Sequence, residues 1–305
     1  MQRFLVRRLI ITLITVLVVS LIIFIMARAA GDPRALMLNP LSTEDQWDEL
    51  GELLGLDKPY YQQYGLFLKN MVMGDFGDSI KESRPARDVI GERIMPTFKL
   101  GMAAFIFSLL VGVPLGILSS VKRGGILDQL GRVVALIGQS APSFWLGIMF
   151  IFLFAVRLKW VPPSSDQEWN SIFLPAITLG WFFVASNMRL VRSAMLDVLD
   201  SEYIKLARAK GVSGTAVIWK HALRNALIPP LTFAGVTLGS LVAGSLVVEV
   251  VFAWPGLGRL AVQAMSAHDY PVLQGVVIIY TLMYVGAAFL VDVLYAYIDP
   301  RIRYT

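Results

Sequence analysis

Six stretches of this chain contain no Asp, Glu, Lys, Arg or His. They are between 18 and 24 residues long and cover 9–27, 100–121, 133–156, 171–188, 225–248 and 270–291. A helix needs about 20 apolar residues to cross the hydrocarbon core of a bilayer. The buried helices of a soluble protein would instead keep charged side chains on one face. The runs therefore predict an all-α integral membrane protein with six transmembrane helices.

The composition excludes several other classes of protein. Only 16% of the 305 residues are charged and 56% are hydrophobic, whereas soluble domains carry roughly a quarter charged residues. The net charge is +5, but the Lys and Arg residues are scattered, so no nucleic-acid partner is expected. There is no cysteine and there are only two histidines, so we predict no metal site, no catalytic residues and no cofactor bound by this chain.

The first run could also be read as a cleaved signal peptide. Arg3, Arg7 and Arg8 precede it, and an Ala-x-Ala sequence follows. However, its 19 residues exceed the usual apolar core of about 7–15 residues. We therefore interpret it as a retained first span.

The loop charges predict the orientation, because Lys and Arg accumulate in cytoplasmic loops. Residues 189–224 carry seven basic and three acidic residues, whereas residues 28–96 carry eight basic and twelve acidic ones. Both termini are therefore expected in the cytoplasm. The predicted organisation is an N-terminal span (1–27), an outer helical cap (28–96), a five-helix core (97–300) and a cytoplasmic tail (301–305).

The outer cap is predicted to be folded. Thr43-Glu44-Asp45-Gln46 is typical of a capping box, in which the Thr and Gln side chains satisfy free backbone amides. A helix would run from there to about Leu54 and end at Gly55. The sequence "PYYQQYGLFLKNMVMG" predicts a second short helix.

Small and polar residues interrupt the spans. "GVPLG" (112–116) and "GVTLG" (235–239) are Gly-xxx-Gly pairs, which let helices approach closely in lipid. Pro114, Pro142 and Pro175 are expected to remove backbone bonds inside spans two, three and four. Five uncharged polar residues are predicted to line a translocation path, with helix–helix hydrogen bonding as the alternative: Gln139, Ser140, Ser143, Ser186 and Asn187.

Residues 197–230 predict two short cytoplasmic helices. Ser201 caps "EYIKLARAK", Gly211 ends it, and Ser213 caps a second helix that Pro229 and Pro230 terminate. A basic amphipathic helix can lie on anionic lipid. This one offers mostly Ala, and small residues favour docking into a groove of another protein.

These residues carry a family resemblance. "EYIKLARAKGVSGTAVIWKHALRNALIP" resembles the cytoplasmic coupling segment, the EAA loop, of membrane subunits of bacterial ABC importers. Together with "GSLVVEVVFAWPGLGRLAVQAMSAHDYPVLQG", "VDVLYAYIDPRIRY" and "LGLDKPYYQQYGLFLKNMVMGDFGDS", it is similar to the oligopeptide/dipeptide permease family. Four motifs in the same order extend the resemblance over the whole chain.

The resemblance implies a permease subunit of the inner membrane with the type I importer fold, which forms half of a peptide pathway. Its partners would be a second homologous permease, two subunits that bind ATP and Mg²⁺, and an extracytoplasmic substrate-binding protein. Related systems import nickel chelates or oligosaccharides, so the substrate stays open. The residues implied in contact with the ATPase are Glu202, Tyr203, Lys205, Ala207, Arg208, Ala209, Lys210 and Gly211.

The sequence departs from the family pattern at two places. Lys205 and Leu206 occupy the positions of the first Glu-Ala of the broad importer motif, a substitution typical of peptide permeases. His268 stands where relatives usually carry Arg, so the role of a positive charge there is open.

The sequence also weighs against other functions. It contains no G-x-x-x-x-G-K-[ST] motif, so the energy for transport must come from a partner, and no H-E-x-x-H or G-x-S-x-G motif of an intramembrane enzyme. An ATPase-independent channel or secondary carrier would need ionisable residues inside the bundle. Glu249 and Asp292 lie only at the edges of uncharged runs.

Overall fold

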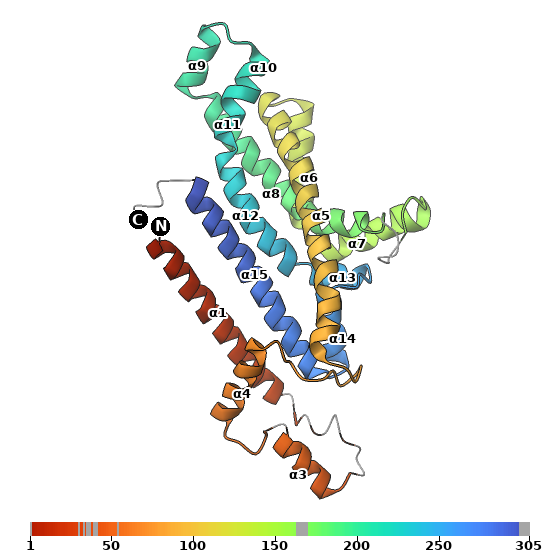
Figure 1. Cartoon of the computed structure of the whole chain (residues 1–305). Helices are drawn as coiled ribbons and strands as arrows, with labels where there is room; N and C mark the ends of the chain where they lie inside the picture. Colours follow the sequence, from red (N-terminus) through yellow and green to blue (C-terminus); the bar gives the residue numbers. More distant parts are fainter. Residues whose placement is uncertain are drawn as a thin grey trace.

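The computed structural model describes residues 2–29, 31–32, 34, 38, 42–53, 55–162 and 170–298, without the side chains of 2–5, 53, 127, 130, 134, 292 and 294–298. These residues form helices and one isolated bridge between Asp78 and Pro85, with no extended strand among them. Figure 1 shows the helices in a tall bundle, with α9 and α10 at one end and α3 and α4 at the other. The N-terminal third contains α1 (Gln2–Ala29), which is a candidate span, and the short helices α3 (Glu44–Leu53) and α4 (Tyr60–Val72).

The bundle and the helix pair at its other end follow in chain order. Their elements are α5 (Ala86–Val121), α6 (Ile126–Ser140), α7 (Ser143–Phe150), the π-helix η1 (Ile151–Arg157), α8 (Phe173–Leu199), α9 (Glu202–Ala209), α10 (Gly214–Ala216), the π-helix η2 (Val217–Ala222), α11 (Leu223–Ala226), α12 (Ile228–Ala243), α13 (Leu246–Val251), α14 (Leu257–Ser266) and α15 (Tyr270–Ile298).

The helices confirm the predicted all-α membrane class. Within the described residues, α1, α5, α8 and α15 are each long and apolar enough to cross a membrane. Two further pairs of helices pass the same test only when each bent pair is taken as one span. The described residues therefore hold between four and six candidate spans, and six stays a prediction.

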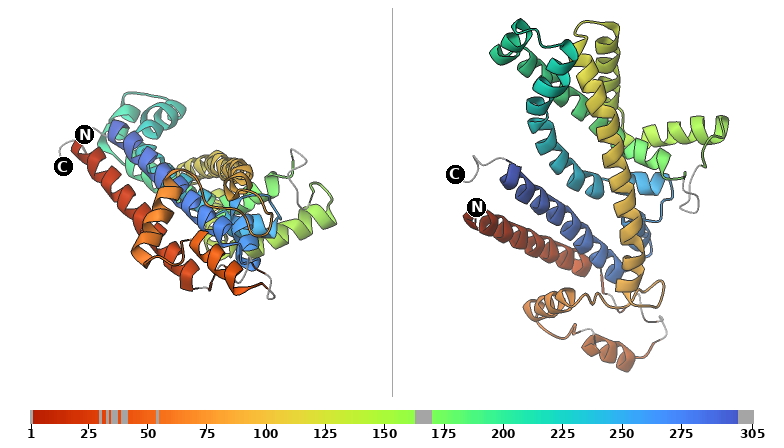
Figure 2. Two further views of the ribbon diagram at one scale, coloured as in Figure 1. Left: turned by 60° about the horizontal axis from the view of Figure 1, so that its bottom comes forward. Right: turned by 45° about the horizontal axis from the view of Figure 1, so that its top comes forward.

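The sequence predicted that the third apolar run forms one span. The structure instead divides this run into two helices with different directions. α6 ends at Ser140, α7 begins at Ser143, and the two axes differ by 111°. Pro142 has no N–H and forces the preceding residue out of the helical region, and Ala141 is accordingly extended, with ψ of 128°. α7 and η1 consequently project sideways from the bundle in both views of Figure 2.

Two other expectations about the spans need correction. α5 begins at Ala86, so the predicted boundary between cap and core at residue 96 falls inside a continuous helix. Pro175 lies in the first turn of α8, where a backbone N–H has no helical partner in any case. Its ring therefore costs that helix no hydrogen bond. Pro114 does lie inside α5, as expected.

The outer cap folds as its sequence predicted. The backbone N–H of Thr43 donates to Oε1 of Gln46 (3.1 Å), which is half of the capping box. α3 ends before Gly55, whose φ of +64° is the left-handed conformation that glycine adopts without strain. α4 packs on α1, where the ring of Tyr64 lies 5.4 Å from that of Phe24.

The contact between α5 and α8 is made through backbone rather than through large side chains. A Cβ atom added at Gly116 would lie 2.7 Å from the carbonyl oxygen of Met188, and one at Gly112 would lie 2.9 Å from that of Val184. In return, a Cβ at Gly180 of α8 would lie 2.7 Å from the carbonyl oxygen of Ala104. The predicted Gly-xxx-Gly packing is confirmed here.

A buried carboxylate joins the outer ends of the core helices. Glu249 of α13 is fully buried and accepts hydrogen bonds from Oγ1 of Thr97 (2.7 Å), Oγ of Ser245 (2.8 Å) and the backbone N–H of Gly258 (2.6 Å). The amides at the start of α14 thus face a negative charge, which is favourable at a helix N-terminus. Glu249 is a packing acid, as its position at a run edge suggested.

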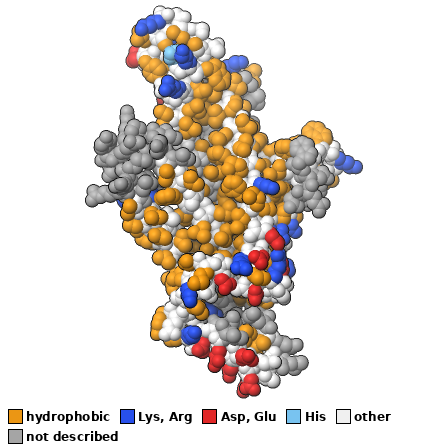
Figure 3. Space-filling model, in the orientation of Figure 1, with side chains coloured by type: hydrophobic (Ala, Val, Ile, Leu, Met, Phe, Trp, Pro, Cys, Tyr) orange, Lys and Arg blue, Asp and Glu red, His pale blue; other side chains and the backbone are white. Residues whose placement is uncertain are grey.

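The surface agrees with a membrane-embedded middle. Figure 3 shows hydrophobic side chains over the middle of the visible face. Lys and Arg gather around the end that carries α9 to α11, whereas Asp and Glu gather at the end that carries α3.

The α5–α8 contact leads to a test of stability. Gly116→Leu should lower the thermal stability of the purified protein strongly, because its side chain would enter the backbone of α8. Gly286→Leu is the matched control, since a Cβ at that position meets no atom within 4 Å. Measured melting temperatures should fall for the first variant only, and equal values for both would contradict the packing.

Candidate functional site

Residues 201–226 form the pair of short helices that the sequence predicted. Ser201 precedes α9 in an extended conformation, with ψ of 153°, but its side chain does not cap the helix as predicted. Its hydroxyl instead donates to the carbonyl oxygen of Val198 (2.5 Å). Gly211 has φ of +80°, and Val212 donates its N–H back to the carbonyl of Ala207 (3.2 Å). Oγ of Ser213 then accepts the N–H of Ala216 (3.4 Å) and caps the second helix. A Cβ at Gly211 would meet nothing within 4 Å, so there is room for a side chain at this position. Glycine is favoured there because of the positive φ angle.

The helix pair is anchored to the ends of two spans. Ile204 is fully buried, and Val217 is almost so. Both belong to one apolar cluster with Ile117 of α5 and with Val191 and Met195 of α8. A displacement of α9 must therefore move the ends of α5 and α8, because close-packed interiors transmit strain.

Tyr203 of α9 forms hydrogen bonds with the second helix of the pair. Its hydroxyl accepts a hydrogen bond from Nδ2 of Asn225 (2.8 Å) and donates to the carbonyl oxygen of His221 (3.4 Å). α9 is thus held to the second helix by an apolar contact and by a polar one.

The rest of α9 faces solvent. Nζ of Lys205 pairs with Glu202 at 2.7 Å, and both side chains are exposed. Ala207 is half-buried, whereas the other proposed contacts beyond it are exposed: Arg208, Ala209, Lys210 and Gly211. Leu206 and Trp219 were not among the predicted contacts, yet their exposed fractions are 56% and 58%. Large apolar side chains in these two short helices were the signal that the prediction missed.

Four of the five predicted path residues lie around the break between α6 and α7. Nε2 of Gln139 donates to Oγ of Ser186 on α8 (3.4 Å), and that hydroxyl donates to the carbonyl of Phe182 (3.1 Å). Ser140 and Ser143 are exposed on either side of the break. A hollow of about 430 Å³ opens there, lined by Ile137, Ser140, Ala141, Pro142, Phe144 and Trp145.

Asn187 does not join the other four. It is fully buried, and its Nδ2 donates to Oγ of Ser108 on α5 (3.5 Å). Its Oδ1 has no hydrogen-bond partner. The side chain therefore belongs to the α5–α8 contact, because Asn187 lies on the face of α8 that Gly112 approaches.

An ion pair joins three helices at the end of the bundle that carries α9. Asp128 of α6 is buried and accepts hydrogen bonds from Nε of Arg192 on α8 (2.8 Å), Oγ of Ser119 on α5 (2.5 Å) and the N–H of Gly124 (3.0 Å). The Arg192 guanidinium above all, then these two donors, hold the pKa of Asp128 below its ordinary value. Nothing in the sequence pattern had singled out Asp128.

His268, which stands where Arg was expected, is exposed with φ of +55°. The next residue, Asp269, is buried and accepts a hydrogen bond from Oγ of Ser79 (2.5 Å). The same carboxylate accepts a second hydrogen bond from the backbone N–H of Lys81 (3.3 Å). Asp269 thus fastens the loop before α5 to the start of α15. No cluster of three or more His, Cys, Asp or Glu within the described ranges could hold a metal ion.

Solved structures share this fold. The MetNI methionine ABC transporter in inward-facing conformations matches with a TM-score of 0.59 and 22% identity, over 69% of this chain and 96% of that one. An amino acid ABC transporter solved with histidines matches with a TM-score of 0.56 and 15% identity, over 68% and 94%. The fold is therefore that of ABC importer permeases.

The sequence comparison gives the family. Residues 112–304 match the binding-protein-dependent transport system inner membrane component, and residues 1–95 match the N-terminal part of such membrane components. The glutathione transport system permease proteins GsiC of Escherichia coli K12 and Shigella dysenteriae serotype 1 are 40% identical over 305 residues, which is 100% of each chain. The chain belongs to this family. It is an ABC importer permease subunit of the oligopeptide/dipeptide type, a multi-pass protein of the inner membrane.

Proposed function

We propose that this chain forms half of a translocation pathway for peptides. The observation that carries the proposal is the end-to-end similarity to a permease named for glutathione, which is itself a small peptide. The uncharged polar residues at the α6–α7 break support it. A peptide backbone carries many donors and acceptors, and weak polar contacts let it pass without being trapped.

Uptake measurements test the substrate. Cells that express the complete transporter should accumulate labelled di- and tripeptides, including glutathione, and should lose this uptake when this permease is deleted. Uptake must also stop when the ATPase subunits are inactivated, because the chain has no phosphate-binding loop of its own. Accumulation of nickel chelates or oligosaccharides in place of peptides would contradict the proposed substrate. Uptake that survives without the ATPase would indicate a channel or a secondary carrier.

The proposed partners are a second homologous permease, two ATP-binding subunits that hold ATP and Mg²⁺, and an extracytoplasmic binding protein. α9 is the proposed docking element for an ATPase subunit. Its outward face combines Leu206 with the charged pair Glu202 and Lys205, while Ile204 on the opposite face holds it to α5 and α8. An amphipathic helix in a groove is a common mode of protein recognition.

Alanine substitutions at Leu206 and Ile204 distinguish an effect on docking from an effect on folding. Leu206→Ala should leave the melting temperature of the permease unchanged and weaken copurification of the ATPase subunits, because Leu206 is 56% exposed. Ile204→Ala should destabilise the helix pair by about 2–5 kcal/mol, as for other buried Ile→Ala substitutions. Full ATPase copurification with the Leu206 variant would remove α9 as the docking element.

The proposed topology has six spans, with both termini and the helix pair in the cytoplasm and residues 28–96 outside. Since the native chain has no cysteine, single cysteines report location directly. An impermeant thiol reagent added to intact cells should label Glu82→Cys and should label Ser213→Cys only after the cells are opened. Labelling of Ser213→Cys in intact cells would reverse the orientation.

The proposed path includes Gln139, Ser140, Ser143 and Ser186, and faces the second permease. Cysteines introduced at Gln139 and Ser143 should crosslink to that partner or to a photoreactive peptide. Asn187→Cys on α8, next to Ser186, is the control, because its side chain is buried against α5. Crosslinking of the first two positions only to lipid would place this face outside the path.

A further inference from the structure

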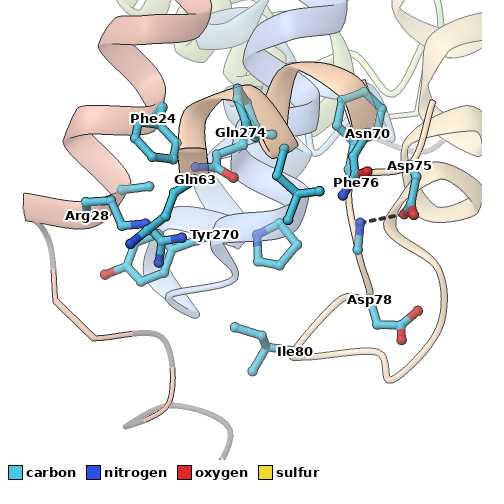
Figure 4. A pocket seen from close by; sticks show the side chains of 15 residues that line it. Phe24, Arg28, Gln63, Asn70, Asp75, Phe76, Asp78, Ile80, Tyr270 and Gln274 are labelled. Atoms are coloured by element: carbon cyan, nitrogen blue, oxygen red, sulfur yellow. Dashed lines mark hydrogen bonds between the residues drawn. The ribbon is translucent and has the colours of Figure 1, made fainter. Parts of the chain in front are cut away.

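A cavity of about 250 Å³ lies in the outer part of the molecule, away from the α6–α7 break. Four segments form its wall: the end of α1, α4, the loop 75–80 and the start of α15. Figure 4 shows side chains of all four converging on it, with Arg28 and Asp78 on separate walls. Drug-sized ligands occupy about 300–1,000 Å³, so this cavity suits a smaller molecule.

The loop that forms one wall is held in place. Asp75 Oδ1 accepts the N–H of Gly77 (2.9 Å), and the carbonyl of Gly77 accepts the N–H of Ala86 (2.9 Å). The bond from Ser79 to Asp269 joins the same loop to α15. The cavity is thus bounded by segments that are fastened to one another.

Opposite charges on this wall form no direct ion pair with one another among the described residues. The Arg28 guanidinium lies over the Phe24 ring, 5.5 Å from its centre. Asp32 attracts it electrostatically, but Asp32 itself forms its direct ion pair with Arg34. The carboxylate of Asp78 has no ion pair or side-chain hydrogen bond among the described residues, and Asp75 accepts only the Gly77 amide. One cation and two carboxylates therefore belong to the residues that line the same cavity, with no ion pair between them.

A buried acceptor without a donor adds a second, independent observation. Gln63, which lines the cavity, is 8% exposed. Its Nε2 donates to the carbonyls of Leu56 (3.2 Å) and Lys58 (2.7 Å), but its Oε1 has no partner. Buried polar atoms are almost always hydrogen-bonded, so an unsatisfied acceptor remains inside the residue layer that forms this wall.

We propose that this cavity binds a small zwitterion, with its oxyanion against Arg28 and its primary ammonium against Asp75 and Asp78. An ammonium supplies several N–H donors, which are what the acceptor-rich wall requires. Two molecules carry this chemistry at the outer surface of the membrane: the headgroup of phosphatidylethanolamine and a short peptide. Phe24, Leu66 and Phe67 add an apolar side to the cavity.

Binding can be measured on the purified, delipidated transporter without its binding protein. Glycerophosphoethanolamine and dialanine are the two probes, titrated calorimetrically. Glycerophosphocholine lacks N–H donors, acetylated dialanine lacks the ammonium, and dialanine amide lacks the carboxylate, so each should bind more weakly than its parent. Arg28→Gln and Asp78→Asn should each weaken binding roughly tenfold, the loss typical of one charge-assisted hydrogen bond.

Lys69→Gln and Asp57→Asn are matched controls, because they remove an exposed charge of the same cap without lining the cavity. Arg28→Lys keeps the charge and should retain most of the affinity, which separates a lost contact from a lost fold. Binding of the phosphoethanolamine probe alone assigns the site to lipid, and binding of dialanine assigns it to peptide. Binding of neither probe, or equal binding by the wild type and the Arg28→Gln variant, would overturn the proposal.

Discussion

The backbone contact between α5 and α8 is the constraint on which the rest of the structure depends. Lipid is as apolar as the helices, so hydrophobicity cannot hold them together and close packing must do so. Gly112, Gly116 and Gly180 remove the side chains that would keep the two backbones apart. The consequence reaches both ends of the molecule, because α5 runs without interruption from the loop 75–85 to the Asp128 ion pair near α9.

This contact also determines which helices move when the helix pair is displaced. Ile204 and Val217 pack into the same cluster as Ile117 and Val191, near the C-terminal ends of α5 and α8. A partner that pushes on α9 therefore acts on the two most closely packed spans rather than on a flexible loop. The broken third span lies against α8, so the same displacement reaches Gln139 through its bond to Ser186.

At the end that carries α3 and α4, hydrogen bonds to buried carboxylates hold the elements together. There, buried carboxylates join elements that are far apart in the chain: Glu249 holds α13 to the start of α14 and to Thr97, and Asp269 holds α15 to Ser79. Each carboxylate is satisfied by several donors, which offsets the cost of burying its charge. The cavity between α1, α4 and α15 differs, because Arg28 and Asp78 line it without forming a direct ion pair among the described residues.

The sequence by itself determined the features that depend on neighbouring residues. Run lengths predicted a multi-pass helical protein, Gly211 and Ser213 predicted the elbow, and paired glycines predicted close helix contacts. Only the tertiary structure decided what depends on distant residues. The 111° break at Pro142 could equally have been a mild kink, since a proline permits either outcome and packing selects one. Asn187 faces α5, and Asp128 meets Arg192, because three helices converge there, and such partners have no local signal in the sequence.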